Sequence, residues 1–303
     1  MSKAAHPACV SRVRHVGAAR SVEDMTVPTL TLNNGVQIPQ FGYGTWQVPP
    51  ETAQDRVTEA LDLGYRHIDT AQMYGNEAGV GAAIAASGLA RDEVFVTTKL
   101  NNNRHDAAVV AGSLDESLEK LQLDRVDLFL IHWPLPTTDI DFVDTWRAME
   151  EVYSAGKARA IGVSNFQPSH LRRVVQEGTV VPAVNQVEIH PYFTQDDLRA
   201  VNAEHGVATE AWSPLAQGQV FDDSALQAIA ASTGRSVSQV VLRWHLQRGD
   251  IVFPKASSVD RLKQNFDVFD FELSPADMGA ISALDAGRRI GPDLDTMSWI
   301  PKD

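Results

Sequence analysis

The sequence predicts an α/β fold in which eight parallel strands close into a (β/α)8 TIM barrel with helices around it. From Val27 onward, short β-branched or apolar runs alternate with longer segments of helical period, and there are eight such runs. Strands separated by helices run parallel with right-handed crossovers, and eight of these units can close on themselves. A length of 303 residues also suits a single barrel of this kind.

The expected strands are short, and a hairpin precedes them. The hairpin pairs Thr29–Leu32 with Val36–Ile38 through Asn34-Gly35, a dipeptide that tolerates the positive φ angles of a tight turn. We expect this N-terminal β-hairpin to lie at the barrel floor. The eight strands are predicted at Gln40–Gly44, Arg66–Asp69, Val94–Thr98, Val126–Ile131, Arg159–Val163, Ala183–Val187, Val207–Ala211 and Ile251–Phe253.

The connecting segments carry helix signals. Residues 110, 114, 118 and 121 are apolar and lie on one face of a helix. Another helix follows Pro49-Pro50 and ends near Gly64, and a later one covers Ser236–Leu246. The last begins at Ser274-Pro275, where Ser caps the first turn and Pro takes its first position. From Gly287 the chain is expected to form an irregular C-terminal tail near the active-site mouth.

The first residues differ in composition from the rest. Residues 1–22 hold four basic side chains and no acidic one. A targeting peptide is one interpretation, but the apolar stretch of a secretory signal is missing. The other is a disordered extension, with the folded chain starting near Met25. We expect a disordered N-terminal extension over residues 1–24 and one barrel domain over residues 25–303.

Composition excludes several classes of function. The chain is 44% hydrophobic and 21% charged, as in ordinary globular proteins. A formal charge of −13 opposes binding to nucleic acid or to an anionic membrane surface. No run of about 18 apolar residues is present. The only cysteine, Cys9, permits no intrachain disulfide, which favours a reducing compartment, and we expect the protein to be cytoplasmic.

Polar and aromatic residues stand at the ends of the predicted strands. In a parallel barrel all eight strand ends open on one face, where active sites are built. We therefore expect residues that are remote in sequence to meet at one cavity. These are Trp46, Asp69 with Tyr74, Lys99, His132, Asn165, Gln186, Trp212 and Lys255.

Four of these residues form a set suited to proton chemistry. Asp69 would hold Lys99 charged, and the ammonium beside Tyr74 would lower the pKa of the phenol from its usual value of about 10. Such a tyrosine can give a proton to a developing alkoxide, and His132 would lie beside it. Each residue taken alone also fits an ordinary polar loop. Four of them at strand ends favour an active site.

Two further groups have alternative interpretations. Trp46, Trp133 and Trp299 would line an aromatic pocket above the ionisable set, or pack in the core or rim. A second group clusters around strands seven and eight, where barrels place phosphate sites. Its basic side chains favour an anion, and the alternative is an ordinary solvated helix start. The group is Ser213, Lys255, Ser257 and Arg261.

Other enzyme classes fit less well. G-x-x-x-G-x-G over residues 75–81 and Y-x-x-x-K from Tyr153 to Lys157 suggest a short-chain dehydrogenase on a doubly wound sheet. That fold needs its glycine turn after the first strand, whereas here it follows the second. Gly156 also reads as the end of a helix over Phe142–Ala155. The histidines lack paired-ligand spacing, so no metal site is expected, and no serine-hydrolase or P-loop motif occurs.

Several long motifs resemble those of the aldo-keto reductase family. They are GYRHIDTAQMYGNE (64–77), LIHWP (130–134), AIGVSNF (160–166) and FPKASSVDRLKQN (253–265). The resemblance runs from about Val27 to Asp285 and keeps the family's motif order. EAWSPL (210–215) and the segment Val241–Gly249 resemble the bacterial branch that includes 2,5-diketo-D-gluconic acid reductases.

The resemblance implies roles for the ionisable set. Tyr74 would be the general acid, Lys99 would lower its pKa, Asp69 would pair with Lys99, and His132 would orient the substrate carbonyl. Trp46, Trp133 and Trp299 would complete the substrate pocket with Tyr74 and His132.

It also implies NADPH (NADP+) as the cofactor. Trp212 would stack on the nicotinamide, where most relatives have Tyr. Ala256 stands where the family often has Ser or Thr, so one donor to a 2′-phosphate is missing, although Lys255 and Arg261 remain. The implied contacts are Thr45 and Asp69; Ser164, Asn165 and Gln186 on the carboxamide; Ser213, Leu215 and Gln217 on the pyrophosphate; and Lys255, Ala256, Ser257, Arg261, Gln264 and Asn265 around the adenosine.

The resemblance thus predicts reduction of aldehydes or ketones to alcohols with NADPH, by a cytoplasmic monomer whose partner is a small carbonyl substrate. Two alternatives stay open. One is a nucleotide-binding regulatory barrel with little catalysis, and the other is a reductase that prefers NADH.

Overall fold

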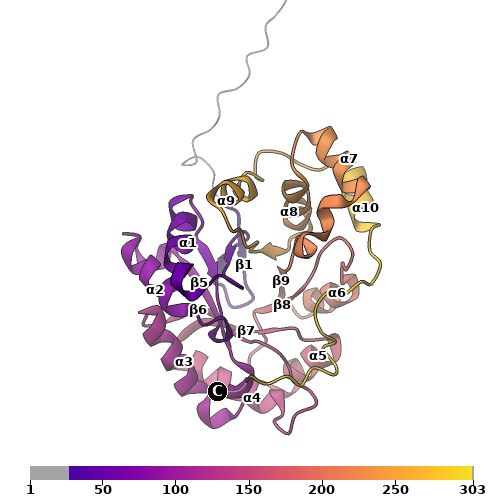
Figure 1. Cartoon of the computed structure of the whole chain (residues 1–303). Coiled ribbons are helices and arrows are strands. Elements are labelled where there is room, and N and C mark those ends of the chain that lie inside the picture. The colour runs from indigo at the N-terminus through magenta and orange to yellow at the C-terminus, as the bar shows by residue number, and fades with distance from the viewer. Residues whose placement is uncertain (1–26, 302–303) are drawn as a thin grey trace, which may run out of the picture.

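The computed structural model describes residues 27–301, and its centre is an eight-stranded parallel sheet (Figure 1). The sheet closes on itself, since the Gly42 N–H donates to the Val252 carbonyl at 2.8 Å and the Val252 N–H donates to the Gln40 carbonyl at 3.0 Å. The predicted barrel is confirmed. Its strands, hydrogen-bonded in chain order, are β3 (Tyr43–Gly44), β4 (His67–Asp69), β5 (Phe95–Leu100), β6 (Val126–Ile131), β7 (Ala158–Ser164), β8 (Val184–Glu188), β9 (Ala208–Trp212) and β10 (Ile251–Val252).

Helices follow the strands and surround the barrel. Serine hydroxyls cap two of them: Ser274, as predicted, accepts from the Asp277 N–H, and Ser236 accepts from the Gln239 N–H. None of the helices within residues 27–301 combines the length and apolarity needed to cross a membrane. They are α1 (Pro50–Asp62), α2 (Glu77–Ala86), α3 (Ala107–Leu121), α4 (Phe142–Ser154), α5 (Pro168–Glu177), α6 (Asp196–Glu204), α7 (Ser224–Thr233), α8 (Val237–Arg248), α9 (Val259–Phe266) and α10 (Pro275–Ser282).

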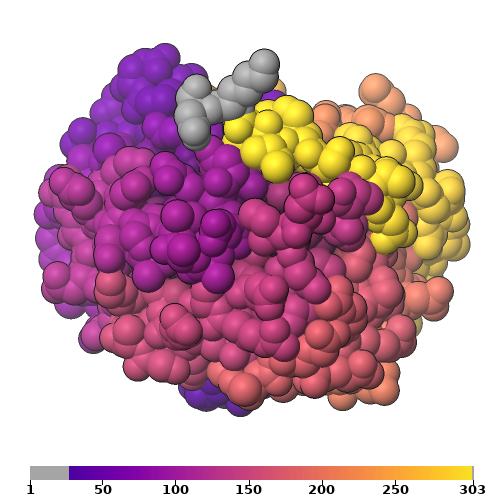
Figure 2. Space-filling view, turned by 90° about the horizontal axis from the view of Figure 1, so that it is seen from below, coloured from indigo at the N-terminus to yellow at the C-terminus, as the bar shows by residue number. Residues whose placement is uncertain are grey.

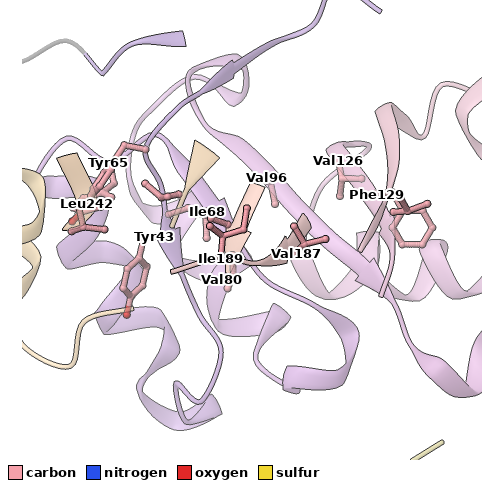
Figure 3. Close-up of a cluster of buried hydrophobic side chains, with 14 of the residues drawn as sticks. Tyr43, Tyr65, Ile68, Val80, Val96, Val126, Phe129, Val187, Ile189 and Leu242 are labelled. Carbon is pink, nitrogen blue, oxygen red and sulfur yellow. The ribbon is translucent and has the colours of Figure 1, made fainter. Parts of the chain in front are cut away.

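An apolar core fills the space between strands and helices. Figure 3 shows some of its members, including Ile68 and Val96 from strands and Val80 and Leu242 from helices. Strand side chains alternate between two faces. Ile68 and Val96 point outward into this core. Asp69, one position after Ile68 on β4, and Lys99, three positions after Val96 on β5, therefore face the barrel interior.

The hairpin lies at the floor, as predicted. Its strands β1 (Thr29–Thr31) and β2 (Gln37–Pro39) pair antiparallel. Buried Leu32 and Ile38 belong to an interior apolar cluster with residues of β5, β6, β7, β8 and β10. The Asn33 and Asn34 side-chain amides donate to backbone carbonyls of Pro182 and Arg159, both at 2.9 Å. The hairpin therefore fills the end of the barrel at which the strands begin.

The tail after Gly287 crosses the opposite end. The Glu188 carboxylate, at the end of β8, accepts from the backbone N–H groups of Ile290 at 2.6 Å and Gly291 at 2.8 Å. Further along, the Asn102 side-chain amide donates to the Trp299 carbonyl at 2.9 Å. Figure 2 shows the tail (yellow) lying against segments from the first half of the chain (purple and magenta). The expected position near the mouth is confirmed.

The glycines of the two dehydrogenase-like patterns have structural roles in this fold. Gly81 lies in α2, where an added Cβ would meet the Leu121 carbonyl oxygen at 2.3 Å, so this glycine allows α2 and α3 to approach closely. Gly156 has φ +76° just beyond α4, and Lys157 pairs with Asp115 rather than with Tyr153. The residues therefore do not form a Tyr-Lys pair on one helix.

The expected extension over residues 1–24 lies outside the described residues.

Candidate active site

Four ionisable side chains meet where the strands end. The Lys99 ammonium on β5 donates to Asp69 Oδ1 at 2.6 Å and to Tyr74 Oη at 3.4 Å. Tyr74 closes a short 3-10 helix (Gln72–Tyr74) after β4. Its ring lies edge-on to the His132 ring, with centroids 5.6 Å apart. Strand geometry thus gathers a phenol, an amine, a carboxylate and an imidazole at one point.

A residue that sequence reasoning missed holds the loop that carries Tyr74. Asn76 is buried, and its amide donates to the Thr45 carbonyl at 2.9 Å and to the Val48 carbonyl at 3.0 Å. The Thr70 hydroxyl donates to its side-chain oxygen at 2.8 Å. Thr45, predicted as a cofactor contact, is fully buried in this network. Its side chain therefore supports the loop.

Burial governs the charges of the set. Burial raises the pKa of Tyr74, and the opposing effect of Lys99 does not cancel it. The expected net lowering of this pKa is therefore wrong, because desolvation of the phenolate outweighs the effect of the ammonium. Burial favours a lower pKa for Lys99, but the effects of Asp69 and Tyr74 are larger together, so the pKa of Lys99 is raised. His132 is neutral, since burial holds its pKa well below the usual value.

A connected set of polar groups lies beside the tetrad. The Trp212 indole N–H donates to Asn165 Oδ1 at 2.8 Å, and the Asn165 amide donates to Ser164 Oγ at 3.1 Å. The Ser164 hydroxyl in turn donates to the Gln186 carbonyl at 2.9 Å. These predicted carboxamide contacts and the predicted stacking residue therefore form one network, and Asn165 adopts a positive φ of 65° within it.

A buried carboxyl under this network was not expected. Glu210 faces inward from β9, and its Oε2 accepts from Gln186 Nε2 at 2.9 Å. Burial first, and then nearby Asp69, raise the pKa of Glu210 to about 8. A signal was present, because Glu210 stands two residues before Trp212 and strand side chains two apart share a face. A carboxyl inside an apolar strand is also unusual.

The predicted pyrophosphate and adenosine contacts follow β9 and β10, in the connecting loops, in the 3-10 helix Ala216–Asp222 and in α9. Ser213 and Gln217 have φ values of 51° and 52°, and Leu215 lies between them.

Lys255 and Arg261 are exposed and, within the described chain, neither pairs with a carboxylate. The Tyr43 hydroxyl donates to the carbonyl of buried Ala256 at 3.3 Å, fixing the loop. Ser257 and Gln264 are exposed, and Asn265 is buried in α9.

The three tryptophans have different settings. Trp133 stacks beside the His132 ring at 6.3 Å, whereas Trp46 and Trp299 are 46% and 54% exposed. A cavity of about 510 Å³ lies elsewhere, between the hairpin, α6 and the end of α8. Because sites in such barrels form where the strands end, the tetrad rather than this cavity is the candidate active site.

With this geometry in place, comparison with known proteins identifies the family. Residues 39–286 match the aldo/keto reductase family. The chain belongs to the aldo-keto reductase family. The predicted fold, family and oxidoreductase class are thereby confirmed.

Named relatives of this aldo-keto reductase share nearly their whole length with it. The glyoxal reductase of Bacillus subtilis is 47% identical over 270 residues, covering 89% of this chain and 97% of the relative. The methylglyoxal reductase DkgA of Escherichia coli is 45% identical over 274 residues, covering 89% and 98%. A solved aldo-keto reductase of Bombyx mori in complex with NADP is 37% identical, covers 88% of this chain and 96% of its own, and has a TM-score of 0.83.

Proposed function

We propose that this protein reduces small aldehydes and ketones, glyoxal and methylglyoxal among them, with NADPH and with Tyr74 as the general acid. The observation that carries the proposal is the Lys99 ammonium, held by Asp69 at 2.6 Å and lying 3.4 Å from the Tyr74 hydroxyl. The identity of 45–47% with glyoxal and methylglyoxal reductases supports the substrate class.

The side chains of this site divide the proton chemistry among themselves. Tyr74 carries its proton at neutral pH, because burial raises its pKa. A carbonyl oxygen placed between Tyr74 and neutral His132 would receive a hydrogen bond from each. NADPH, when bound, supplies the hydride to the carbonyl carbon. Tyr74 then gives its proton to the oxygen, and the Lys99 ammonium stabilises the phenolate that remains.

The residues around the tetrad fit NADPH. The Trp212 indole N–H donates to Asn165 Oδ1 at 2.8 Å, which orients the indole through its edge and leaves a ring face for stacking on the nicotinamide. Exposed Lys255 and Arg261, without acidic partners in residues 27–301, fit a 2′-phosphate beside the start of α9. Ser258 caps that helix by accepting from the Arg261 N–H. Close approach of the 2′-phosphate to these cations would favour NADPH over NADH.

The direct test is NADPH oxidation, followed by absorbance, on adding methylglyoxal or glyoxal to the purified chain. Steady oxidation with methylglyoxal, and slower oxidation with NADH, is the expected result. Tight NADPH binding without turnover on any small carbonyl would instead support the regulatory barrel. A cytoplasmic monomer completes the proposal, and light scattering at the mass of one 33.1 kDa chain would support the monomer.

The cofactor preference has its own test at Arg261. Arg261→Ala removes a charged donor from the proposed phosphate site, and such hydrogen bonds contribute about 1.5–3 kcal/mol. We expect KM for NADPH to rise about 10- to 100-fold while KM for NADH stays nearly constant. Exposed Arg172 on α5 gives the matched control, Arg172→Ala. Equal rises for the two cofactors would contradict the phosphate role.

A further inference from the structure

A single nitrogen joins two buried carboxyl groups behind the active site. Gln186 Nε2 donates to Asp69 Oδ2 at 2.8 Å and to Glu210 Oε2 at 2.9 Å. Gln186 and Glu210 occupy neighbouring inward-facing positions, since they are direct partners in the register of β8 and β9. All three residues are buried to 2% exposure or less. The two hydrogens of the amide nitrogen are therefore both used.

Two acceptors on one amide nitrogen fix the whole side chain. An amide is planar, so the positions of its two N–H bonds also determine where its oxygen points. With Asp69 alone as acceptor, the amide could turn about the one remaining hydrogen bond. With both acceptors, Gln186 Oε1 has one orientation, and none of the hydrogen bonds found among residues 27–301 uses that oxygen.

The surroundings of Glu210 suit this holding role. Its Oε1 has no hydrogen-bond partner in the described chain and lies 3.7 Å from His67 Nε2. His67 and Asp69 face it from β4, Lys99 from β5 and Gln186 from β8. Burial lowers the pKa of His67 to about 3, so this ring is neutral. Whether Glu210 is protonated on Oε1 or ionised, Oε2 keeps a lone pair for Gln186.

We propose that Glu210 is a positioning residue that, together with Asp69, locks the Gln186 amide so that Gln186 Oε1 accepts an N–H from the carboxamide of the cofactor. The inference rests on the proposed cofactor site, in which Gln186 contacts the nicotinamide. Glu210 itself contacts Gln186 and is not one of the four side chains of the tetrad. Its effect is on recognition of the carboxamide donor rather than on the proton transfer from Tyr74.

The test compares NADP+ with its 3-acetylpyridine analogue, in which a methyl group replaces the carboxamide nitrogen. Tryptophan fluorescence quenching gives both dissociation constants without turnover. One neutral hydrogen bond corresponds to about a three- to tenfold preference for NADP+ in the wild type. Glu210→Leu and Glu210→Met remove the acceptor at similar volume, and we expect either to bring the preference close to one. Circular dichroism reports which of the two variants is folded.

Two further variants separate orientation from general packing. Glu210→Gln keeps an oxygen acceptor and is expected to restore the preference. Gln186→Leu is expected to abolish it, and adding Glu210→Leu to that variant should change it no further. A wild-type preference retained in folded Glu210→Leu or Glu210→Met, or lost equally in Glu210→Gln, would overturn the inference.

Failure of the proposed function gives a different pattern. Absence of methylglyoxal reduction by the wild type, with the analogue preference and its loss in Glu210→Leu intact, would refute the substrate class and leave Glu210 in its role. Reduction by a wild type that binds NADP+ and the analogue equally would refute the contact by Gln186, and with it this inference.

Discussion

At the residue scale, desolvation and charge act on Tyr74 in opposite directions. Burial keeps the phenol protonated, whereas Lys99 at 3.4 Å favours the phenolate. A proton donor needs both effects at different moments, because it must hold the proton before the reaction and tolerate its loss afterwards. The ammonium, held by Asp69 and by the Thr70 carbonyl at 2.9 Å, is fixed before any substrate arrives. Such preorganised charge is a large contribution to catalysis in many enzymes.

Tyr74→Phe tests the proton donor. Removal of a general acid typically reduces the rate about 10²- to 10⁴-fold. We expect kcat for methylglyoxal to fall in that range while quenching titrations give an unchanged dissociation constant for NADPH. Tyr153→Phe on α4, beside Asn33 and Asn34 of the hairpin at the barrel floor, is the matched control and should leave kcat unaltered. Normal turnover by Tyr74→Phe would rule out the assignment.

The tetrad was predictable because parallel strands bring their ends to one face, so position in sequence gave position in space for Asp69, Lys99 and His132. The supporting residues were harder to predict. Asn76 acts through backbone carbonyls of Thr45 and Val48, and a sequence does not reveal which carbonyls a loop will present. The pKa of Tyr74 depends on how completely the site is buried, which requires coordinates.

At the scale of elements, one side chain that attaches the tail to the barrel is Glu188. Glu188 is buried at the end of β8, and it receives hydrogen bonds from His190 Nε2 at 2.9 Å and from the Ile290 and Gly291 amides. Burial raises the pKa of Glu188, but these hydrogen bonds outweigh it and lower the pKa. Gly291 also lies against Trp212, since an added Cβ would meet that indole at 2.7 Å. Glu188 thus holds the tail beside Trp212, the proposed stacking residue.

Glu188→Gln should release this tail. An amide cannot accept from all three donors, and each lost charge-assisted bond costs about 1.5–3 kcal/mol. We expect trypsin to cut after Arg288 and Arg289 about tenfold faster or more. Glu204→Gln, at an exposed position of α6, is the control, and an unchanged cleavage rate in Glu188→Gln would argue against attachment of the tail by Glu188.

The same variant has a pH signature. Because the folded pKa of Glu188 is lowered, its stabilising effect is present above 4.5, the ordinary carboxyl value, and is lost as the pH falls through the folded pKa. The difference in unfolding free energy between wild type and Glu188→Gln should therefore be largest near pH 7 and shrink below pH 4.5. Urea titrations at pH 7 and below pH 4.5 measure this difference. A difference that stays constant would show that the Glu188 charge does not stabilise the tail.

Element boundaries followed from the sequence where local signals are strong. Pro50 begins α1, Ser236 caps α8, and β6 has the predicted bounds Val126–Ile131. Between β9 and β10, however, the chain inserts α7 as well as α8, and the helical period alone predicted only the second. The Asp223 cap and the positive φ of Gly234 mark the ends of α7. The same residue types also favour turns, so they do not by themselves predict a helix.

At the scale of the whole molecule, barrel closure depends on a close approach between the first and last strands. Gly44 ends β3 beside Phe253, and a Cβ added there would lie 2.5 Å from the Phe253 carbonyl oxygen. Backbone on both sides leaves no flexible group to move aside. The seam is also narrow, because β3 and β10 have two residues each.

Gly44→Ala should therefore destabilise the fold. Overpacking of this kind costs about 1–3 kcal/mol or more, and we expect a lower urea midpoint by circular dichroism. Gly112→Ala provides the contrast, because Gly112 lies in α3 with open space around it, and alanine in a helix is about 1 kcal/mol better than glycine. Equal midpoints for Gly44→Ala and wild type would show that the seam can open without cost.

The Gln40 side chain donates to the Asp250 carbonyl across a separation of 210 residues, and the same two regions form the seam of the barrel. During synthesis the first strand has no partner on that side until most of the polypeptide has left the ribosome. Contacts of such long range slow folding and leave a strand edge available to other chains in the meantime. Conditions that stall translation before residue 250 should therefore promote aggregation of this protein.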